Sequence, residues 1–412
     1  MMRAPSRHRP VSLLLAAVVV TACAPDRPET RAVAGVRDTL PDGRVVVRYP
    51  ALPAGDPLPA AVDLRIGVVE GPAEEIFGDV RGVEADRDGT IYVLDHQAAE
   101  IRAFDADGRF VRTVASRGEG PGELDTPNGM VLVHDTLLWV QDPGGWRMIG
   151  LATDGGEVDR YPMPVLAFGY IWEGTVDRHG RLWKHQVHST AERVFPPEEG
   201  LTEAIVHEYM VVYDPARAEK DSVYLGAVPS RTLIQRNNRG GHTYFPVPFD
   251  PRPITTVHAD GTIWRTDADT YRIVRIGADG DTTLVIESEV APPPVTDRDR
   301  LEYVEARVAR DPEQRRVAER VARLMPPAKP VITSLSTDDE GRLWVGRTRT
   351  DDFGPLYDVF SADGTWEGSV ELAFDLPASM PIRVRGGRVY TTIQDSLGVP
   401  VVVRTHRVFE PS

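Results

Sequence analysis

Cysteine is nearly absent from this chain of 412 residues, because Cys23 is the only one. The rest of the chain therefore has no thiol for a disulfide, a zinc finger or cysteine-based catalysis. The sequence also lacks a glycine-rich phosphate loop, a nucleophile elbow and a basic stripe with interleaved aromatic residues. Its formal net charge of −15 at pH 7 should repel duplex DNA and anionic lipid headgroups. These absences argue against nucleotide-binding P-loop enzymes, elbow-type serine hydrolases and nucleic-acid-binding proteins.

The chain instead repeats one short pattern, a tight turn followed by an apolar run with an aromatic residue three places after the turn. The pattern occurs six times, with the aromatic residues Tyr92, Trp139, Trp183, Trp264, Trp344 and Tyr390. Four of the seven tryptophans occupy this one position. Asp-Gly and similar pairs supply the positive φ that a hairpin turn needs. The run after each turn is apolar on both faces, which is typical of a strand buried between sheets.

A second hairpin follows most copies, as in Glu100–Val114 and Arg272–Ile286. Each unit thus has four strands, and four-stranded sheets repeated radially form a β-propeller. The sixth unit runs out of chain before its fourth strand, which we expect Ala61–Gly71 to supply. The sequence therefore predicts an all-β fold over residues 61–410, a six-bladed propeller of antiparallel blades closed by an N-terminal strand. An open array or a packed β-sandwich is the alternative.

The first 22 residues have the layout of a secretory signal, with a basic start and an apolar run from Val11 to Ala22 that is too short to span a bilayer. Val20 to Cys23 resembles a bacterial lipobox, which implies lipidation of Cys23. Residues 23–60 then read as the lipidated cysteine and a flexible tether, in which Gly43–Pro50 has the composition of a short strand. Ala24 is not the Asp that retains such proteins at the inner membrane. By this resemblance the protein is anchored on the periplasmic or outer side, at the outer membrane, through the lipid alone.

Two spacings between successive turns are much longer than the others and hold three insertions: His185–Ala204, Pro229–Pro253 and Pro292–Pro330. In a propeller, all three connections belong to one face, and insertions on one face of a repeat fold commonly mark its binding face. The third is predicted to be helical, over residues 291–329. Thr296–Arg310 has a stripe of Leu301, Val304 and Val308, and Asp311–Leu324 begins with an N-cap Asp and a Pro. A lid packed on the ring is the first interpretation, and a movable cover is the second.

The loops that enter the blades are expected to reach the mouth of the central channel. The predicted ligand-binding residues there are Arg81, Asn128, Trp172, Glu173, Arg252, Thr333 and Arg383. For any one of them, satisfying the backbone groups of its loop is the alternative role. Asp95, Asp142 and Asp267 end second strands, and we expect them to hold the following loop by Asx-type bonds. His185 and His188 could chelate a metal only if their segment bends.

With these repeats in view, Gly82–Met130 resembles the NHL-repeat class of six-bladed propellers. The segment follows that pattern in its turn, the aromatic residue and the Asp after the turn, the Phe-Asp pair and the Gly-Glu-Gly-Pro-Gly-Glu linker. The whole layout is similar to a group of bacterial six-bladed propeller lipoproteins, and this resemblance implies a fold and a location but no chemistry. Relatives in fold include calcium-dependent lactonases and peptide-amidating lyases, whose metal lies on the propeller axis. Only Glu173 and Asn128 stand where such a site would need ligands, and Ca²⁺ is the metal that this resemblance implies.

Two functions of different classes follow. The first is a lipid-anchored envelope protein that binds an envelope protein, a peptide or a glycan on its insertion-rich face, with no nucleic-acid partner. The second is a metal-dependent lactonase, hydrolase or lyase with Glu173 and Asn128 at the channel mouth. One-sided insertion without a recognisable catalytic set favours the first.

Overall fold

The computed structural model describes residues 32–53, 56–162, 174–189, 199–236, 240–277, 279–349, 354–377 and 380–409. Contacts divide the chain into Met1–Thr30 and Arg31–Ser412, and all of the structure below belongs to the second unit. The expected signal segment and Cys23 lie outside the described residues. In the part of the chain that is described, no helix is long and apolar enough to cross a membrane.

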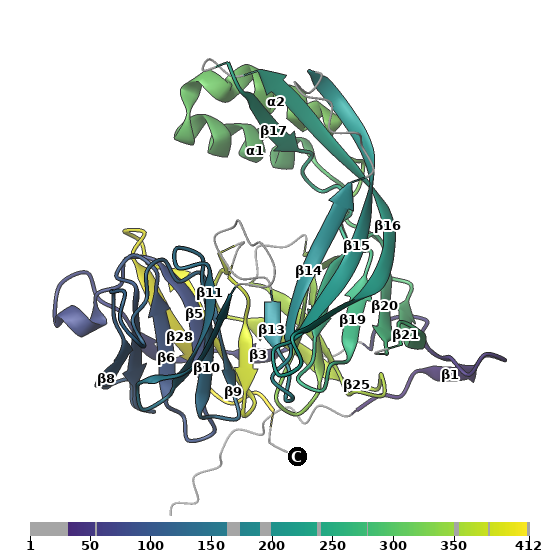
Figure 1. The fold of residues 1–412 in the computed structure, drawn as a ribbon. Helices are drawn as coiled ribbons and strands as arrows, with labels where there is room; N and C mark the ends of the chain where they lie inside the picture. Colours follow the sequence, from purple (N-terminus) through teal and green to yellow (C-terminus); the bar gives the residue numbers. More distant parts are fainter. Residues whose placement is uncertain are drawn as a thin grey trace, which may run out of the picture. The chain divides into compact units, whose positions relative to one another are not determined.

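Six antiparallel sheets follow one another along the chain (Figure 1). Sheet one consists of β5 (Val80–Ala85), β6 (Ile91–Asp95), β7 (Glu100–Phe104) and β8 (Phe110–Ala115). Sheet two consists of β9 (Met130–Val133), β10 (Leu137–Asp142), β11 (Arg147–Ala152) and β12 (Glu157–Pro162). Sheet three consists of β13 (Gly174–Val176), β14 (Leu182–Ser189), β15 (Gly200–Asp214), β16 (Glu219–Arg236) and β17 (His242–Pro246).

The other three sheets each gain strands from the N-terminal part of the chain. Sheet four consists of β18 (Ile254–Val257), β19 (Ile263–Thr266), β20 (Tyr271–Ile276) and β21 (Thr282–Ser288), extended by β2 (Val45–Tyr49) and β1 (Val36–Thr39). Sheet five consists of β22 (Ile332–Thr337), β23 (Leu343–Arg347), β24 (Leu356–Phe360) and β25 (Trp366–Leu372), extended by β3 (Leu58–Ala60). Sheet six consists of β26 (Arg383–Arg385), β27 (Arg388–Gln394), β28 (Pro400–Thr405) and β4 (Val62–Ile66).

The repeated aromatic residue has a structural role in three of the six copies. The indole Nε1 of Trp344 donates to the Asp338 carboxylate over 3.0 Å, and Trp183 makes the same bond to Asp177 over 2.9 Å. In sheet one the Tyr92 hydroxyl donates to Asp86 over 3.1 Å. Each Asp begins the turn six residues earlier and also accepts backbone N–H groups of that turn. The aromatic side chain therefore fixes the turn while its ring fills the space between sheets.

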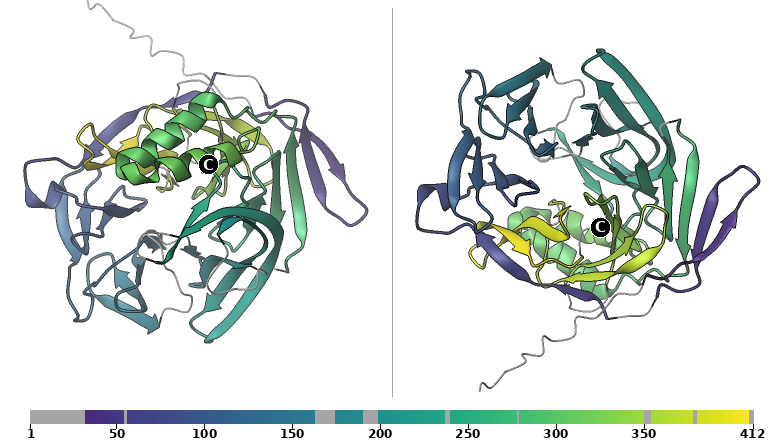
Figure 2. Two further views of the ribbon diagram at one scale, coloured as in Figure 1. Left: turned by 90° about the horizontal axis from the view of Figure 1, so that it is seen from above. Right: turned by 90° about the horizontal axis from the view of Figure 1, so that it is seen from below.

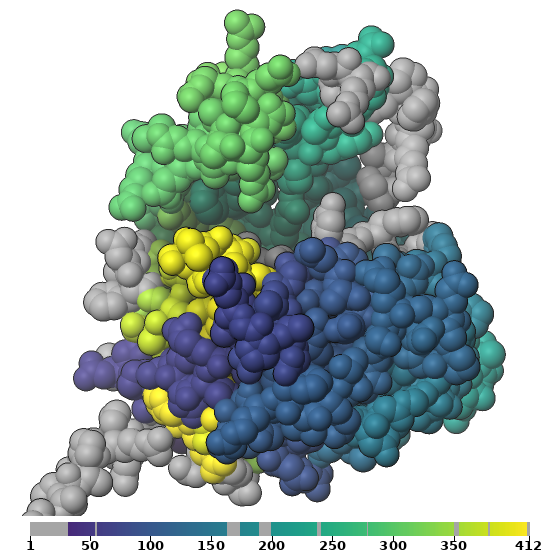
Figure 3. All heavy atoms as spheres, turned by 90° about the vertical axis from the view of Figure 1, so that its left-hand side faces the viewer, coloured from purple at the N-terminus to yellow at the C-terminus, as the bar shows by residue number. Residues whose placement is uncertain are grey.

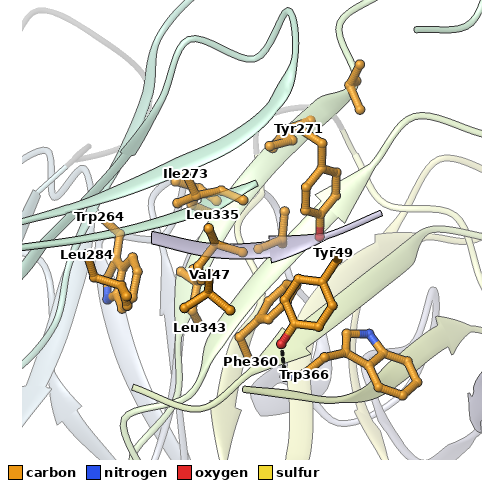
Figure 4. Close-up of a cluster of buried hydrophobic side chains, with 14 of the residues drawn as sticks. Val47, Tyr49, Trp264, Tyr271, Ile273, Leu284, Leu335, Leu343, Phe360 and Trp366 are labelled. Carbon is orange, nitrogen blue, oxygen red and sulfur yellow. Dashed lines mark hydrogen bonds between the residues drawn. The ribbon is translucent and has the colours of Figure 1, made fainter. Parts of the chain in front are cut away.

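Buried apolar clusters join each sheet to the next along the chain. Figure 4 shows the cluster between sheets four and five, in which Trp264, Tyr271 and Ile273 meet Leu335 and Phe360. A further cluster joins sheet six to sheet one. The N-terminal strand β4 pairs antiparallel with β28, which gives sheet six its fourth strand. The fold is thus an all-β, six-bladed propeller with a helical insertion before sheet five, while closure of the ring stays a prediction.

The segment assigned to the tether differs from the expectation, because much of it is built into sheets. Gly43–Pro50 does contain a strand, β2, which pairs in parallel with β21. β3 pairs in parallel with β25, and the exposed β1 pairs with β2. Tyr49 shows why this segment is ordered, since its hydroxyl accepts from Trp366 N and donates to Gly364 O, both over 2.8 Å. The N-terminal strands thus cover outer edges whose backbone groups would otherwise be unpaired.

The described parts of the first two insertions are mostly strands, with residues 247–253 as a connecting loop. β14, β15 and β16 continue past the height of the neighbouring sheets as one long ribbon, to which β17 adds a further strand (Figure 1). The predicted loop His185–Ala204 contains residues 190–198, which lie outside the described residues. Its ends belong to β14 and β15.

The third insertion forms two helices, α1 (Asp297–Arg310) and α2 (Arg315–Leu324), as expected (Figure 2). Thr296 and Asp299 form a capping box at the start of α1. Val317 and Val321 of α2 pack on Leu233 of β16 and Phe245 of β17. The helical insertion therefore makes its main apolar contact with the ribbon of sheet three. Leu301, placed on the buried stripe by its sequence, is 56% exposed.

Candidate functional site

Two aspartates hold the entry loops of sheets one and two. Asp95 ends β6, and its carboxylate accepts from the backbone N–H groups of Gly78 and Asp79 over 3.0 and 3.1 Å. Asp142 ends β10 and accepts from Thr126 N over 2.8 Å. Asp95 also accepts from Gln97 N and Ala98 N over 3.0 and 3.3 Å, so it holds the following turn as expected. Asp142 differs from the expectation, because its bonds from backbone N–H groups come from the preceding loop. Asp267 differs, because its carboxylate pairs with Arg265 Nη1 over 2.7 Å.

Arg81 and Asn128, two of the predicted site residues, meet at the junction of these loops. Arg81 Nη1 donates to Asn128 Oδ1 over 2.8 Å. The same guanidinium donates twice to Asp79 Oδ2, from Nε over 3.0 Å and from Nη2 over 2.8 Å. Asn128 is 2% exposed, so its amide is held in a nearly dry position. The Asn128 amide oxygen thus accepts a hydrogen bond from a cationic side chain, which makes its surroundings less favourable for a metal ion.

A cavity of about 250 Å³ lies beside Arg81, between the entry loop of sheet one and the β27–β28 turn of sheet six. Its lining residues are Gly78, Asp79, Val80, Arg81, Pro377, Met380, Thr392, Gln394, Gly398 and Pro400. Thr392 is 4% exposed, and its Oγ1 has no hydrogen-bond partner among the described residues. A buried hydroxyl without a partner is costly, so this cavity presents one unsatisfied polar group beside a guanidinium.

Arg383 lies on the other side of Arg81. Both line a smaller hollow of about 20 Å³ together with Met130 and Met380. Arg383 Nε donates to Glu84 of β5 over 2.9 Å. Burial raises the pKa of Glu84, although the Arg383 and Arg385 guanidinium groups act against the rise. The structure thus brings Arg81, Asn128 and Arg383 together around the entry of sheet one.

The other predicted site residues do not join this group. Arg252 and Thr333 are exposed on the loops and strands of sheets four and five. Trp172 and Glu173 lie outside the described residues, as does Cys23. No group of three or more His, Cys, Asp or Glu side chains that could hold a metal ion occurs in the described part.

Sequence reasoning missed a second feature, a row of four rings on the ribbon of sheet three. His188 contacts Tyr209 with ring centroids 5.6 Å apart, and Tyr209 contacts Tyr224 at 5.3 Å. Tyr224 contacts His207 at 5.9 Å, and its hydroxyl lies 3.1 Å from His207 Nδ1. We call these four residues the aromatic ladder. Tyr224 is 50% exposed, so the ladder presents ring faces with polar tips to solvent.

The strand register places the ladder on one face of the ribbon. His188 lies opposite His207, and Tyr209 lies opposite Tyr224, so all four share a face. At the base of that face Leu182 and Tyr213 pack against sheet two. At its far end Leu233, which the register places on the same face, packs against α2. The ladder therefore occupies the stretch of this face between sheet two and the helical insertion; Figure 3 shows the helices and the ribbon as neighbouring surfaces.

The chelating pair considered from the sequence is separated by the strand. His185 and His188 are three residues apart on β14, so their side chains point to opposite faces. His185 Nε2 lies 3.5 Å from Glu208 Oε1, on the face that packs toward sheet four, while His188 belongs to the ladder. The pair therefore cannot hold one metal ion.

The comparison with protein-family models agrees with the fold. Residues 72–136 match a family model described as a 6-bladed beta-propeller. The chain is similar to a protein described as exported from Bacteroides fragilis NCTC 9343, at 11% identity and a TM-score of 0.44, covering 88% of this chain and 99% of that one. It is also similar to a virginiamycin B lyase from Staphylococcus aureus, at 10% identity and a TM-score of 0.35, covering 83% and 98%. The comparison with curated proteins found no match.

Proposed function

We propose that this protein is a lipid-anchored β-propeller of the cell envelope that binds a protein, peptide or glycan ligand on its insertion-rich face. The observation that supports this most directly is the aromatic ladder. Four rings lie in a row on a ribbon that extends past the neighbouring sheets, and half of the Tyr224 side chain is open to solvent. Aromatic side chains with polar tips are enriched at binding surfaces, since they offer contact area at little conformational cost.

The ladder does not serve the fold in the way that the repeated aromatic residues do. Trp183 and Trp344 are fully enclosed between sheets. Tyr209 and Tyr224 come from the extended part of the ribbon, and among the described residues the hydroxyl of Tyr224 contacts His207 alone. Exposed aromatic residues that stabilise no buried layer are better explained by a ligand than by packing.

The anchor in this proposal is the lipid on Cys23, and the location is the periplasmic or outer side of the outer membrane. A Cys23→Ser variant should move from the membrane fraction to the soluble fraction and should lose labelling by a fatty-acid probe. Retention in the membrane fraction without labelling would contradict the anchor and leave the ligand-binding part of the proposal standing.

The metal-dependent lactonase or lyase is the weaker alternative. Its described candidate, Asn128, has its amide oxygen bonded to a guanidinium, and no described carboxylate or His cluster adds ligands beside it. No specific observation on the described residues favours this reaction class.

The binding proposal is tested with purified residues 24–412 on a glycan array and by affinity capture from envelope extracts. The test variant is Tyr209→Ala with Tyr224→Ala. Its matched control is Tyr244→Ala, a tyrosine of similar exposure (57%) on β17 that is not part of the ladder. Binding that the double variant loses and the control keeps supports the proposal. Equal binding by all three proteins contradicts the role of the ladder.

A further inference from the structure

Helix α2 carries a row of arginines on its exposed face that have no ion-pair partner in the described part of the chain. Arg316, Arg320 and Arg323 follow one another at helical spacings of four and three residues, so they lie on one side of the helix. All three are exposed. Among the described residues no carboxylate lies within ion-pair distance of any of them, while the nearby Glu319 faces Arg315 at 4.0 Å. We call these three residues the arginine stripe.

The stripe points away from everything that α2 packs on. Val317 and Val321 face the ribbon, and Ala318 and Ala322 face α1. At 100° per residue these two contacts take up the side of the helix opposite the stripe. The arginines therefore make no contribution to the packing of the insertion.

The stripe is also unfavourable for the helix itself. Arg316 and Arg320 are like charges at four-residue spacing, which destabilises a helix, although Glu319, three residues after Arg316 and four before Arg323, acts against this. Arg315 and Arg316 occupy the first turn, where the helix dipole favours acidic residues, and this turn holds no acidic residue. Only Arg323, in the last turn, is well placed for the dipole. Three exposed arginines that make no ion pair among the described residues, on a chain with a net charge of −15, form a local cationic surface suited to an anionic partner.

We propose that Arg316, Arg320 and Arg323 bind a linear anionic polysaccharide through its carboxylate or phosphate groups. Guanidinium groups recognise both anions by paired hydrogen bonds. Seven residues of helix span about 10 Å, so a polymer with a charge on each sugar can contact all three at once. This inference rests on the proposed function and narrows its ligand to a charged glycan.

The chemistry of the exposed face favours a polysaccharide over other polyanions. The exposed residues of α2 include no aromatic side chain, so bases of a single-stranded nucleic acid would have nothing to stack on. They also include no large apolar side chain that could enter a bilayer. The same ribbon that carries α2 carries the aromatic ladder, and half-exposed tyrosine rings suit the faces of sugars.

The test measures binding of residues 24–412 to polygalacturonate by isothermal titration calorimetry at several salt concentrations. The variant replaces Arg316, Arg320 and Arg323 together with Gln. The matched control replaces three arginines of similar exposure that are ion-paired with carboxylates: Arg87 with Asp135, Arg109 with Asp107 and Arg298 with Glu302. Both triple variants change the net charge by the same amount. Dextran serves as the uncharged polysaccharide.

The stripe variant should bind polygalacturonate at least ten-fold more weakly in low salt. The magnitude of its slope of log K against log salt concentration should fall by about 2. Each of the three lost contacts no longer releases counterions, which contributes roughly 0.7 to the slope. The control should keep most of the affinity and the slope. Failure of the wild type to bind, or an equal loss in the control, would overturn the inference. The ladder variant should be measured in both assays. If it loses binding on the glycan array but keeps the salt dependence of polygalacturonate binding, the ladder and the stripe have separate roles.

Discussion

Arg81 Nη1 lies 2.8 Å from Asn128 Oδ1, and this hydrogen bond joins the entry loops of two neighbouring sheets. Because Asn128 is 2% exposed, its loss would leave buried polar groups unpaired. We expect Asn128→Ala to lower the free energy of unfolding by about 1–3 kcal/mol. The melting temperature measured by calorimetry should fall accordingly. Arg252→Ala, at an exposed site, is the control and should melt as the wild type does.

The bond between Trp344 and Asp338 predicts a difference between tryptophans of the same repeat position. Trp344→Phe removes the indole donor to the buried Asp338 carboxylate, whereas Trp264→Phe removes ring volume from a tryptophan that makes no such bond in the described structure. We expect the Trp344 variant to be less stable than the Trp264 variant by about 1 kcal/mol. Chemical denaturation with matched m-values measures this difference. Equal losses would show that the bond to Asp338 contributes nothing.

The helical insertion should loosen in acid through Asp299. Burial raises the pKa of this carboxyl, but hydrogen bonds from Lys329 and Thr296 outweigh it and hold the pKa below its usual value. Since the pKa is lower in the folded state, the stabilisation is present above the unfolded value, about 3.9, and is lost as the pH falls through the folded value. Hydrogen exchange in α1 should therefore accelerate below about pH 4. Asp299→Asn should abolish that dependence, and an unchanged acid response in this variant would assign it to another group.

Ile66 tests the closure of the ring. It lies on β4, is 2% exposed, and belongs to the cluster that joins sheets six and one. If the N-terminal strand completes sheet six, Ile66→Ala should cost about 2–5 kcal/mol and lower the melting temperature by several degrees. Val36→Ala, on the exposed edge strand β1, is the control. A melting temperature equal to that of the control would contradict closure by β4.

The repeat made the sheets predictable, and its aromatic position proved to bond the turn that precedes it in three copies. The ribbon was not recognised, although Gly200–Asp214 alternates between exposed and less exposed residues as a strand should. The polar residues of His185–Ala204 are typical of a loop, because this part of the ribbon extends past its neighbours and is partly exposed to solvent on both faces. The parallel pairings of β2 and β3 join residues more than 200 positions apart, and a local pattern carries no information about such partners.

The candidate site was predictable only in part. Position relative to the turn selects Arg81, Asn128 and Thr333, and Arg252 and Arg383 stand beside such positions. In the structure Arg81 bonds to Asn128 and lines one hollow with Arg383. Arg252 precedes β18 and Thr333 belongs to β22, and neither lines that hollow. Ligand binding by these residues stays a prediction. The aromatic ladder depends on the register of three strands, and its members are up to 36 residues apart, so no spacing in the sequence announces it.

Site-specific photocrosslinking in cells tests the central claim most directly. A photoreactive phenylalanine analogue at Tyr224 places the probe on the ladder, and the same analogue at Tyr244 places it on the ribbon outside the ladder. We predict an envelope component of defined size crosslinked from position 224 and absent from position 244. No crosslink from position 224, or the same crosslinks from both positions, would contradict the claim that the ladder binds a ligand.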